Sequence, residues 1–166
     1  MCGIVGGISN NHFDALKSCL PSMAKAISHR GPDAEGYWFE PETGVALGHR
    51  RLSILDLTEA GAQPMISASG RYIIVFNGEI YNHLEIRKIL ELEKNAPSWR
   101  GHSDTESIIA AIEAWGIVKS IEKCRGMFAI AIWDRLEQTL TLIRDRIGEK
   151  PIYYCLQKNL FSFASE

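Results

Sequence analysis

The sequence predicts a single α+β domain that covers residues 1–166 and contains antiparallel sheets. Two kinds of segment can be recognised, helices by their apolar spacing and strands by their two-residue period. Along the chain, segments of one kind follow one another in groups and do not alternate strictly with the other kind. The strands are separated by short hairpin turns, which join antiparallel neighbours. With 46% hydrophobic residues, a chain of this length can bury roughly 70% of its unfolded surface around one core.

Nine strands are predicted, enough for two sheets covered by helices. They share β-branched or continuous apolar residues bounded by glycine, proline or polar turns. Asn77-Gly78 is predicted to end the fifth strand, which is the second arm of a hairpin with its tip at residues 69–70. The predicted strands cover residues 3–8, 37–39, 45–51, the arm that precedes 69, 72–76, 127–133, 139–144, 151–156 and 160–164.

Three helices are predicted from apolar residues at three- and four-residue steps. The first covers residues 13–27, and Pro21 should start it or kink it. Asn82 is expected to cap the second, and Ser103 opens an S-x-x-E capping box before the third, which stops at Gly116. The residues expected to face inward are Leu84, Ile86 or Ile89, and Leu90 in the second helix, and Ile108, Ile109, Ile112 and Trp115 in the third.

Charge and cysteine content argue against several functions. The 18 basic and 20 acidic residues are intermingled and give a net charge of −2, which disfavours binding to nucleic acid or to an anionic membrane. The sequence has neither a leader peptide nor a run of eighteen apolar residues. Cys2, Cys19, Cys124 and Cys155 are far apart and show no metal-ligand spacing. We therefore expect a soluble cytoplasmic protein without a metal site.

The first residues carry the clearest chemical signal. Removal of Met1 would place a thiol and a free α-amino group on one carbon. The ammonium form would lower the thiol pKa, and the neutral amine could take the thiol proton, so that Cys2 would supply both nucleophile and base. The alternative is a chain that merely begins Met-Cys, with Cys2 a small buried hydrophobic residue.

Four further residues, at three places in the chain, allow both a chemical and a structural interpretation. The Asn77 amide and the Gly78 N–H could converge as an oxyanion hole, although Asn-Gly is also a strong hairpin signal. The helix expected to begin at Asn82 argues against a hairpin there. Arg51 could bind a carboxylate through two N–H groups or could be solvated at a strand end. Asp104 could bind an ammonium group, or its carboxylate could simply interact favourably with the helix dipole at the start of the third helix.

The chain also carries seven motifs in a fixed order, and together they resemble the glutaminase domain of glutamine-hydrolysing asparagine synthetases. The resemblance spans the whole chain, and Ile147 in place of the more usual leucine is a conservative departure. The motifs at residues 29–33 and 76–82 resemble those of this branch of the family rather than those of glucosamine-phosphate synthases or phosphoribosyl-pyrophosphate amidotransferases. The motifs are Met1-Cys2-Gly3-Ile4, His29-Arg30-Gly31-Pro32-Asp33, Arg51-Leu52-Ser53-Ile54-Leu55-Asp56, Phe76-Asn77-Gly78-Glu79-Ile80-Tyr81-Asn82, Ser103-Asp104-Thr105-Glu106, Gly126-Met127-Phe128-Ala129 and Asp145-Arg146-Ile147-Gly148-Glu149-Lys150-Pro151.

This resemblance implies a class II glutamine amidotransferase with the N-terminal nucleophile hydrolase fold, in which helical layers enclose two antiparallel sheets. It implies hydrolysis of L-glutamine to glutamate and ammonia through a thioester on Cys2. A chain that keeps Met1 should preserve this site but lack the base. The implied roles are nucleophile for Cys2, oxyanion hole for Asn77 and Gly78, α-carboxylate binding for Arg51, and α-ammonium binding for Glu79 and Asp104, with Asn77 also contacting glutamine.

The family also implies a partner domain. The synthetases continue beyond the position of Glu166 into a domain with a Ser-Gly-Gly-x-Asp-Ser loop that binds ATP, and residues 1–166 contain no such loop. We therefore expect no cofactor in this domain, ATP and Mg in a fused synthetase domain, and ammonia transfer to aspartate. The alternatives are another acceptor such as a sugar acid, a general amidohydrolase whose selectivity does not depend on Arg51 and Asp104, or a module that binds glutamine without cleaving it.

Overall fold

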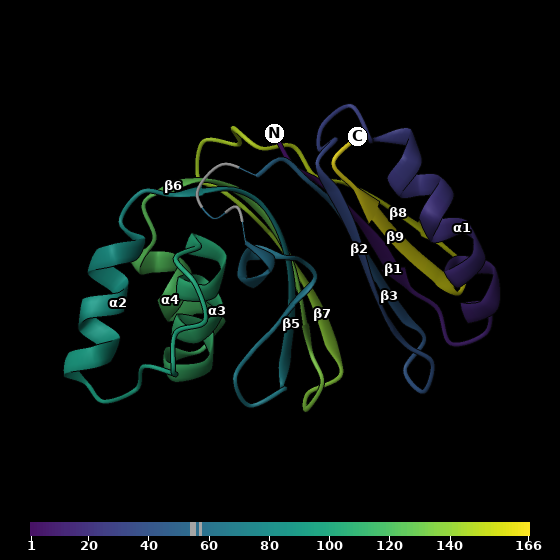
Figure 1. Ribbon diagram of the computed structural model, residues 1–166. Coiled ribbons are helices and arrows are strands. Elements are labelled where there is room, and N and C mark those ends of the chain that lie inside the picture. Colours follow the sequence, from purple (N-terminus) through teal and green to yellow (C-terminus); the bar gives the residue numbers. More distant parts are fainter. Residues whose placement is uncertain (54–55, 57) are drawn as a thin grey trace.

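A computed structural model describes residues 1–53, 56 and 58–166. The chain forms four layers, in which two sheets face each other and helices cover their outer sides (Figure 1). All strand pairs in the described part are antiparallel. This arrangement confirms the predicted α+β class. None of the helices in the described ranges has the length and apolar character needed to span a membrane.

The first strand of the chain lies at the centre of the five-stranded sheet. β1 pairs with β3 on one side and with β9 on the other. The five-stranded sheet has the order β2 (Ala34–Glu40), β3 (Val45–Arg51), β1 (Gly3–Ile8), β9 (Leu160–Ala164) and β8 (Tyr153–Gln157). The four-stranded sheet has the order β4 (Met65–Ile66), β5 (Tyr72–Ile80), β6 (Gly126–Asp134) and β7 (Thr139–Arg144).

Alternation along the strands builds a separate apolar layer on each side of each sheet. In β1, Ile4 joins the cluster between the two sheets, whereas Val5 packs under helix α1 (Phe13–Ala26). In β5, Val75 faces the other sheet and Phe76 faces the helices. Those helices are α2 (His83–Leu92), α3 (Asp104–Trp115) and α4 (Ile117–Lys123), and a short 3-10 turn, η1, spans Glu59–Gly61.

Two expectations about helices need correction. Of the two roles predicted for Pro21, that of starting the helix is wrong, because Pro21 lies inside α1. It sits on the exposed face, where water can satisfy the carbonyl left without an N–H partner. Helix α4 was not predicted, because its seven residues are too few for a clear apolar period. Gly116, with φ +81°, separates α4 from α3 at the predicted end of α3.

The inward faces of α2 and α3 largely follow the prediction. Ile86 and Leu90 are buried in α2, whereas Leu84 is 62% exposed and Ile89 37% exposed, so that neither belongs to the core. In α3, the Ser103 hydroxyl accepts a bond from the Glu106 N–H at 3.2 Å, which is one half of the predicted capping box. The Glu106 carboxylate accepts instead from the Arg100 and Gly101 N–H groups. Ile108, Ile109 and Ile112 are buried, and Trp115 packs against the same cluster.

Asn77-Gly78 does not end its strand, contrary to the prediction. β5 continues to Ile80, and Asn77 and Gly78 pair with Ala129 and Phe128 of β6. A Cβ at Gly78 would approach the Met127 carbonyl oxygen to 2.1 Å. The glycine therefore permits the close approach of β6 rather than a turn.

Asn82 precedes α2, but its side chain makes no cap bond to that helix. Its Nδ2 donates to the Lys123 carbonyl at 3.0 Å, and its Oδ1 accepts from the Arg125 N–H at 2.8 Å. The side chain instead ties the start of α2 to the segment between α4 and β6. In the motif that begins at Arg51, Ile54 and Leu55 lie outside the described residues.

Asp145 fixes the connection between β7 and β8. Its carboxylate accepts N–H bonds from Phe128 and Lys150 through Oδ2, and from Ile147, Gly148 and Glu149 through Oδ1. Burial alone would raise the pKa of Asp145, but these bonds outweigh it and lower the pKa to about 2. One side chain thus sets the path of the backbone that carries Lys150.

We expect Asp145→Asn to lower the free energy of unfolding by about 1–3 kcal/mol, because an amide NH₂ cannot accept the buried N–H bonds. Urea unfolding measures this change, with Glu42→Gln on an exposed turn as the control. A carboxylate with a lowered folded pKa stabilises the fold above its unfolded pKa of about 3.9 and loses that effect below it. The difference between Asp145→Asn and wild type should therefore shrink as the pH falls from about 4 to about 2. Equal stability at pH 7 would contradict this role.

Candidate functional site

A cavity of about 140 Å³ lies where the start of β1, the end of β3, the end of β5 and the start of α3 meet. Its walls also include Met1, Met127 and Lys150. All six residues that the sequence singled out line this cavity: Cys2, Arg51, Asn77, Gly78, Glu79 and Asp104. Residues that are up to 102 positions apart in the sequence are thus collected in one place.

Cys2 is half-buried, and both its sulfur and its backbone carbonyl make hydrogen bonds. Its sulfur accepts from the Leu52 N–H at 3.4 Å and lies 3.6 Å from the Leu52 carbonyl oxygen, to which the thiol donates. The Cys2 carbonyl accepts a bond from Arg30 Nε at 3.1 Å. Burial raises the pKa of the Cys2 thiol and outweighs the Leu52 bond and the positive charges of the chain terminus and Arg51. The thiol is therefore protonated at neutral pH and needs a base.

Asn77 presents a buried amide group to the cavity. The residue is 1% exposed, and its Nδ2 has no hydrogen-bond partner among the described residues. Leaving such a donor unpaired costs about 1–3 kcal/mol, which fits a group kept available for a ligand. Gly78 follows it on β5 and lines the same cavity, so this stretch can offer two N–H donors to an oxyanion.

Arg51 is anchored at the end of β3 by carbonyl groups. Its guanidinium donates to the Asp56 carbonyl, and its Nη1 donates to the Thr58 carbonyl at 2.9 Å. Gly61 makes room for it, because a Cβ there would lie 2.5 Å from Arg51 Nη2. A guanidinium has five N–H donors, so these bonds leave others for an anion in the cavity.

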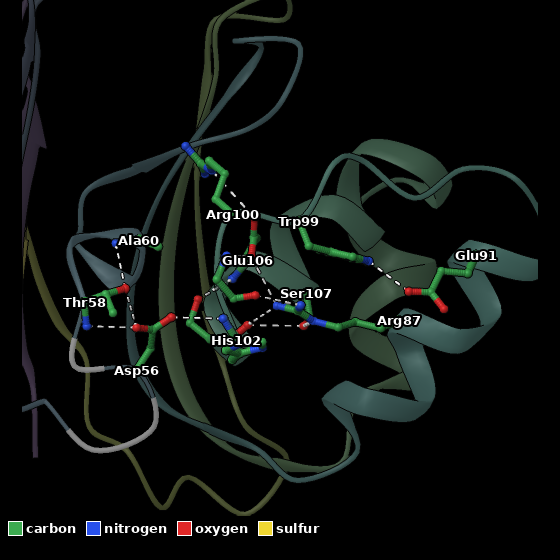
Figure 2. A network of polar contacts seen from close by, with 12 residues as sticks. Asp56, Thr58, Ala60, Arg87, Glu91, Trp99, Arg100, His102, Glu106 and Ser107 are labelled. Carbon is green, nitrogen blue, oxygen red and sulfur yellow. Dashed lines mark hydrogen bonds and ion pairs between the residues drawn. The ribbon is translucent and has the colours of Figure 1, made fainter.

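The Asp56 side chain joins this anchor to the segment that leads into α3 (Figure 2). Its Oδ1 accepts from the Thr58 hydroxyl at 2.6 Å and its Oδ2 accepts from the His102 N–H at 2.9 Å. These bonds lower the pKa of Asp56 to about 2, with the Thr58 hydroxyl the largest cause. The position of Arg51 is therefore coupled to the start of α3, where Asp104 lies.

A buried ion pair stabilises the same segment from its other side (Figure 2). Arg87 on α2 bonds Glu106 at 3.2 Å, the Ser107 hydroxyl at 2.7 Å and the Ser103 carbonyl at 3.0 Å. Glu106 also accepts from the Arg100 N–H at 2.7 Å. A buried ion pair is tolerated when further hydrogen bonds satisfy the remaining donors and acceptors of both partners, and these contacts meet that condition.

Asp104 is the buried acid of the cavity. It is 5% exposed, and its Oδ2 accepts from the Ile80 N–H at 2.9 Å. Burial raises the pKa of Asp104 to about 6, the Glu79 charge adds to this rise, and the bonds from the Ile80 and Thr105 N–H groups oppose it. At pH 7 the side chain still carries its negative charge. The cavity therefore offers the Arg51 cation and the Glu79 and Asp104 carboxylates, a set suited to a zwitterion.

The structure adds side chains to which no role was assigned from the sequence. Arg30 holds the Cys2 carbonyl, Asp56 links the two sides of the cavity, and Lys150 reaches into it from the connection after β7. Each belongs to one of the seven motifs, but the contacts join residues 28 to 149 positions apart. Among the described residues, no group of three or more His, Cys, Asp or Glu side chains could hold a metal ion.

The other three cysteines lie outside this cavity. Cys19 and Cys155 are exposed. Cys124 is buried, its thiol donates to the Ser120 carbonyl at 3.1 Å, and burial raises its pKa to about 12. Only Cys2 therefore combines a thiol with the amide donors of the cavity.

Comparison with known proteins identifies relatives along the whole chain. Residues 1–166 match the family described as glutamine amidotransferase domain. The chain is 40% identical over 170 residues to asparagine synthetase (glutamine-hydrolyzing) 1 of Bacillus subtilis, covering 100% of this chain and 26% of the relative. It is 41% identical over 176 residues to amidase chry2 of Gibberella zeae, with the same two coverages. The chain thus spans about a quarter of the length of these curated relatives.

A solved structure supports the fold. The glutamine phosphoribosylpyrophosphate amidotransferase from B. subtilis superposes with a TM-score of 0.72 at 20% identity, covering 99% of this chain and 42% of that chain. At this identity the likeness concerns the fold alone. It confirms the predicted N-terminal nucleophile hydrolase fold with its two antiparallel sheets.

We expect the Asp104 carboxyl carbon to titrate with a midpoint of about 6 in a ¹³C NMR experiment on the ligand-free protein. Glu79→Gln should lower this midpoint only in part, because it removes a like charge while the larger effect of burial remains. Glu85→Gln, on the exposed face of α2, is the control and should leave it unchanged. A midpoint near 4 in the wild-type protein would mean that water reaches the side chain.

Proposed function

Because this chain belongs to the glutamine amidotransferase domain family, we propose that it hydrolyses the side-chain amide of L-glutamine and provides the ammonia for a second reaction. One observation carries the proposal. The thiol, the unpaired amide donor and the charged groups of both signs line the same cavity. A binding module would need the charged groups but would have no use for a buried thiol beside oxyanion donors.

The charges of the cavity fit the two ends of an amino acid. Arg51 binds the α-carboxylate through the N–H groups that its carbonyl partners leave available. Glu79 and Asp104 bind the α-ammonium group, and Asp104 is negative above its pKa of about 6. With both ends held, the side-chain amide of glutamine is directed toward Cys2 and Asn77. Selectivity for glutamine over simple amides then depends on Arg51 and Asp104.

Catalysis begins once Met1 is removed. The neutral Cys2 α-amine takes the proton of the thiol, and the thiolate attacks the side-chain carbonyl carbon of glutamine. Asn77 Nδ2 and the Gly78 N–H stabilise the oxyanion. The amine returns its proton to the leaving nitrogen, the C–N bond breaks, and ammonia leaves a γ-glutamyl thioester on Cys2. Water, deprotonated by the same amine, then hydrolyses the thioester to glutamate and restores the thiol.

The fate of the ammonia is proposed from the relatives. Glutamine-hydrolyzing asparagine synthetases match this chain over its full length, and this chain covers about a quarter of theirs. We propose that the ammonia reaches a fused synthetase domain that uses ATP and Mg to convert aspartate to asparagine in the cytoplasm. This domain itself requires no cofactor in the reaction above. The chain is similarly identical to an amidase of Gibberella zeae, so cleavage of other amides is the alternative function.

A diazo-ketone analogue of glutamine should add one ligand mass to the protein that begins at Cys2, and the modification should map to Cys2 alone. The other cysteines lack the amine and lie outside the cavity, so Cys19, Cys124 and Cys155 should stay free. Mass spectrometry of the intact protein and its peptides measures this. The matched protein that retains Met1 should release almost no ammonia from glutamine, because a peptide nitrogen cannot act as a base. Labelling spread over several cysteines would reject Cys2 as the nucleophile.

Asn77→Ala should lower kcat about a hundredfold or more and change KM for glutamine little, because the amide serves the charge that develops in the transition state. Steady-state ammonia release measures both constants. Asn82→Ala is the control, since among the described residues that amide bonds the Lys123 and Arg125 backbone and lies outside the cavity. A wild-type kcat in Asn77→Ala would remove this residue from the oxyanion hole.

A further inference from the structure

Lys150 places a buried ammonium group in the wall of the same cavity. The residue is 6% exposed and lines the cavity together with Met1 and Cys2. Among the described residues, no carboxylate lies within 4 Å of its Nζ, and its one side-chain bond is to Met1 Sδ at 3.2 Å. A thioether is a weak acceptor, so the charge is poorly compensated.

The backbone of Lys150 is held by bonds on its N–H and its carbonyl, which fix the point from which the side chain enters the cavity. Its N–H donates to Asp145 Oδ2 at 3.0 Å, and its carbonyl accepts from Arg144 Nε at 3.0 Å. Burying an unpaired ammonium group is costly, and an apolar side chain at this position would avoid the cost. A cost of this kind at a cavity wall is typical of a group that serves function rather than stability.

The contact with Met1 indicates what the charge acts on. Met1 is the residue joined to the Cys2 nitrogen, so the Lys150 ammonium is separated from that nitrogen by at most the length of the Met1 side chain plus the 3.2 Å contact. When Met1 is removed, the nitrogen becomes an α-amine in the same cavity. We propose that Lys150 is a positioning residue whose positive charge disfavours protonation of the Cys2 α-amine and so keeps that amine in its neutral, basic form. The proposal rests on the function proposed above.

Other charged groups around Cys2 act on the amine as well. Arg30 and Arg51 add positive charge. Arg30 Nε donates to the Cys2 carbonyl and its Nη1 lies 4.0 Å from the Glu166 carboxylate, whereas Arg51 donates to the Asp56 and Thr58 carbonyls. The carboxylates of Asp56 on the loop after β3, Glu79 on β5 and Asp104 on α3 oppose them. Asp56 and Asp104 are themselves engaged by N–H groups. The Lys150 ammonium differs from these two cations in its contact with Met1, the residue bonded to the Cys2 nitrogen.

The size of the effect follows from the pH range in which the amine titrates. An unperturbed α-amine with a pKa of about 7.8 is neutral in roughly one seventh of molecules at pH 7. A like charge that lowers this pKa by about one unit raises the neutral share to roughly three fifths. The same change makes the protonated amine a better donor to the leaving nitrogen. Lys150 would thus favour both proton transfers of the acylation step.

The test compares Lys150→Met with wild type in the protein processed to Cys2. The reaction requires the neutral amine, so kcat/KM rises with pH through the amine pKa. Loss of the positive neighbour raises that pKa, and the acidic limb of the profile should move up by about one pH unit. Below the limb, kcat/KM should fall about tenfold. Lys150→Arg should keep most of the wild-type profile, and Lys119→Met, on the exposed face of α4, should match it.

A second measurement does not depend on turnover. In a Cys2→Ala protein from which Met1 has been removed, a ¹³C label in the new first residue reports the titration of the α-amine by NMR. Adding Lys150→Met should raise its midpoint by the same amount, and thermal unfolding should show that Lys150→Met is at least as stable as wild type.

An unmoved amine midpoint and an unmoved acidic limb would overturn the proposal. A lower unfolding temperature together with these two results would show that Lys150 has a structural role. Absence of glutamine hydrolysis in the wild-type protein would instead reject the proposed function, while the α-amine titration would still decide the role of Lys150.

Discussion

The site depends on holding the second residue of the chain still, although chain ends are normally the least ordered part of a domain. β1 begins at Gly3, directly after Cys2, and is paired with β3 and β9 along most of its length. The Ser165 hydroxyl accepts the Ile4 N–H at 3.0 Å, and Arg30 holds the Cys2 carbonyl. The pairing that builds the centre of the sheet therefore also fixes the thiol. A terminal nucleophile is thereby given the rigidity of a core strand.

The charged side of the cavity depends on contacts between loops rather than on strand pairing. Arg51 leaves the end of β3 and is oriented by carbonyls of the loop that Asp56 organises. Asp56 in turn bonds the His102 N–H, and Arg87 with Glu106 fixes the residues around it. Gly61 and Gly101 leave room for these contacts, because a Cβ at either would displace the Arg51 guanidinium or the Asp56 carboxylate. The distance between the cationic and anionic ends of the site is thus set by buried polar contacts.

Much of this could be predicted because its signals are local. Periodicity located most strands and three helices, and the motifs identified the six cavity residues. Pairing is not local, which is why Asn77-Gly78 read as a strand end although β6 continues alongside β5 to Ile80. The Asn82 side chain bonds Lys123 and Arg125, more than 40 positions away, and no sequence period reports such a contact. Lys150 and Met1 are separated by almost the whole chain, so their meeting required the fold.

Burial raises the pKa of two acidic groups in the cavity, the Cys2 thiol and the Asp104 carboxyl, the latter to about 6. A thiol kept protonated reacts slowly with oxidants and stray electrophiles, because the thiolate is the reactive form. Reactivity then has to be created inside the site by a base that is neutral at the working pH. Burial and a neighbouring cation both lower the pKa of an amine, so the burial that keeps the thiol protonated and the charge of Lys150 both favour the neutral form of the Cys2 α-amine.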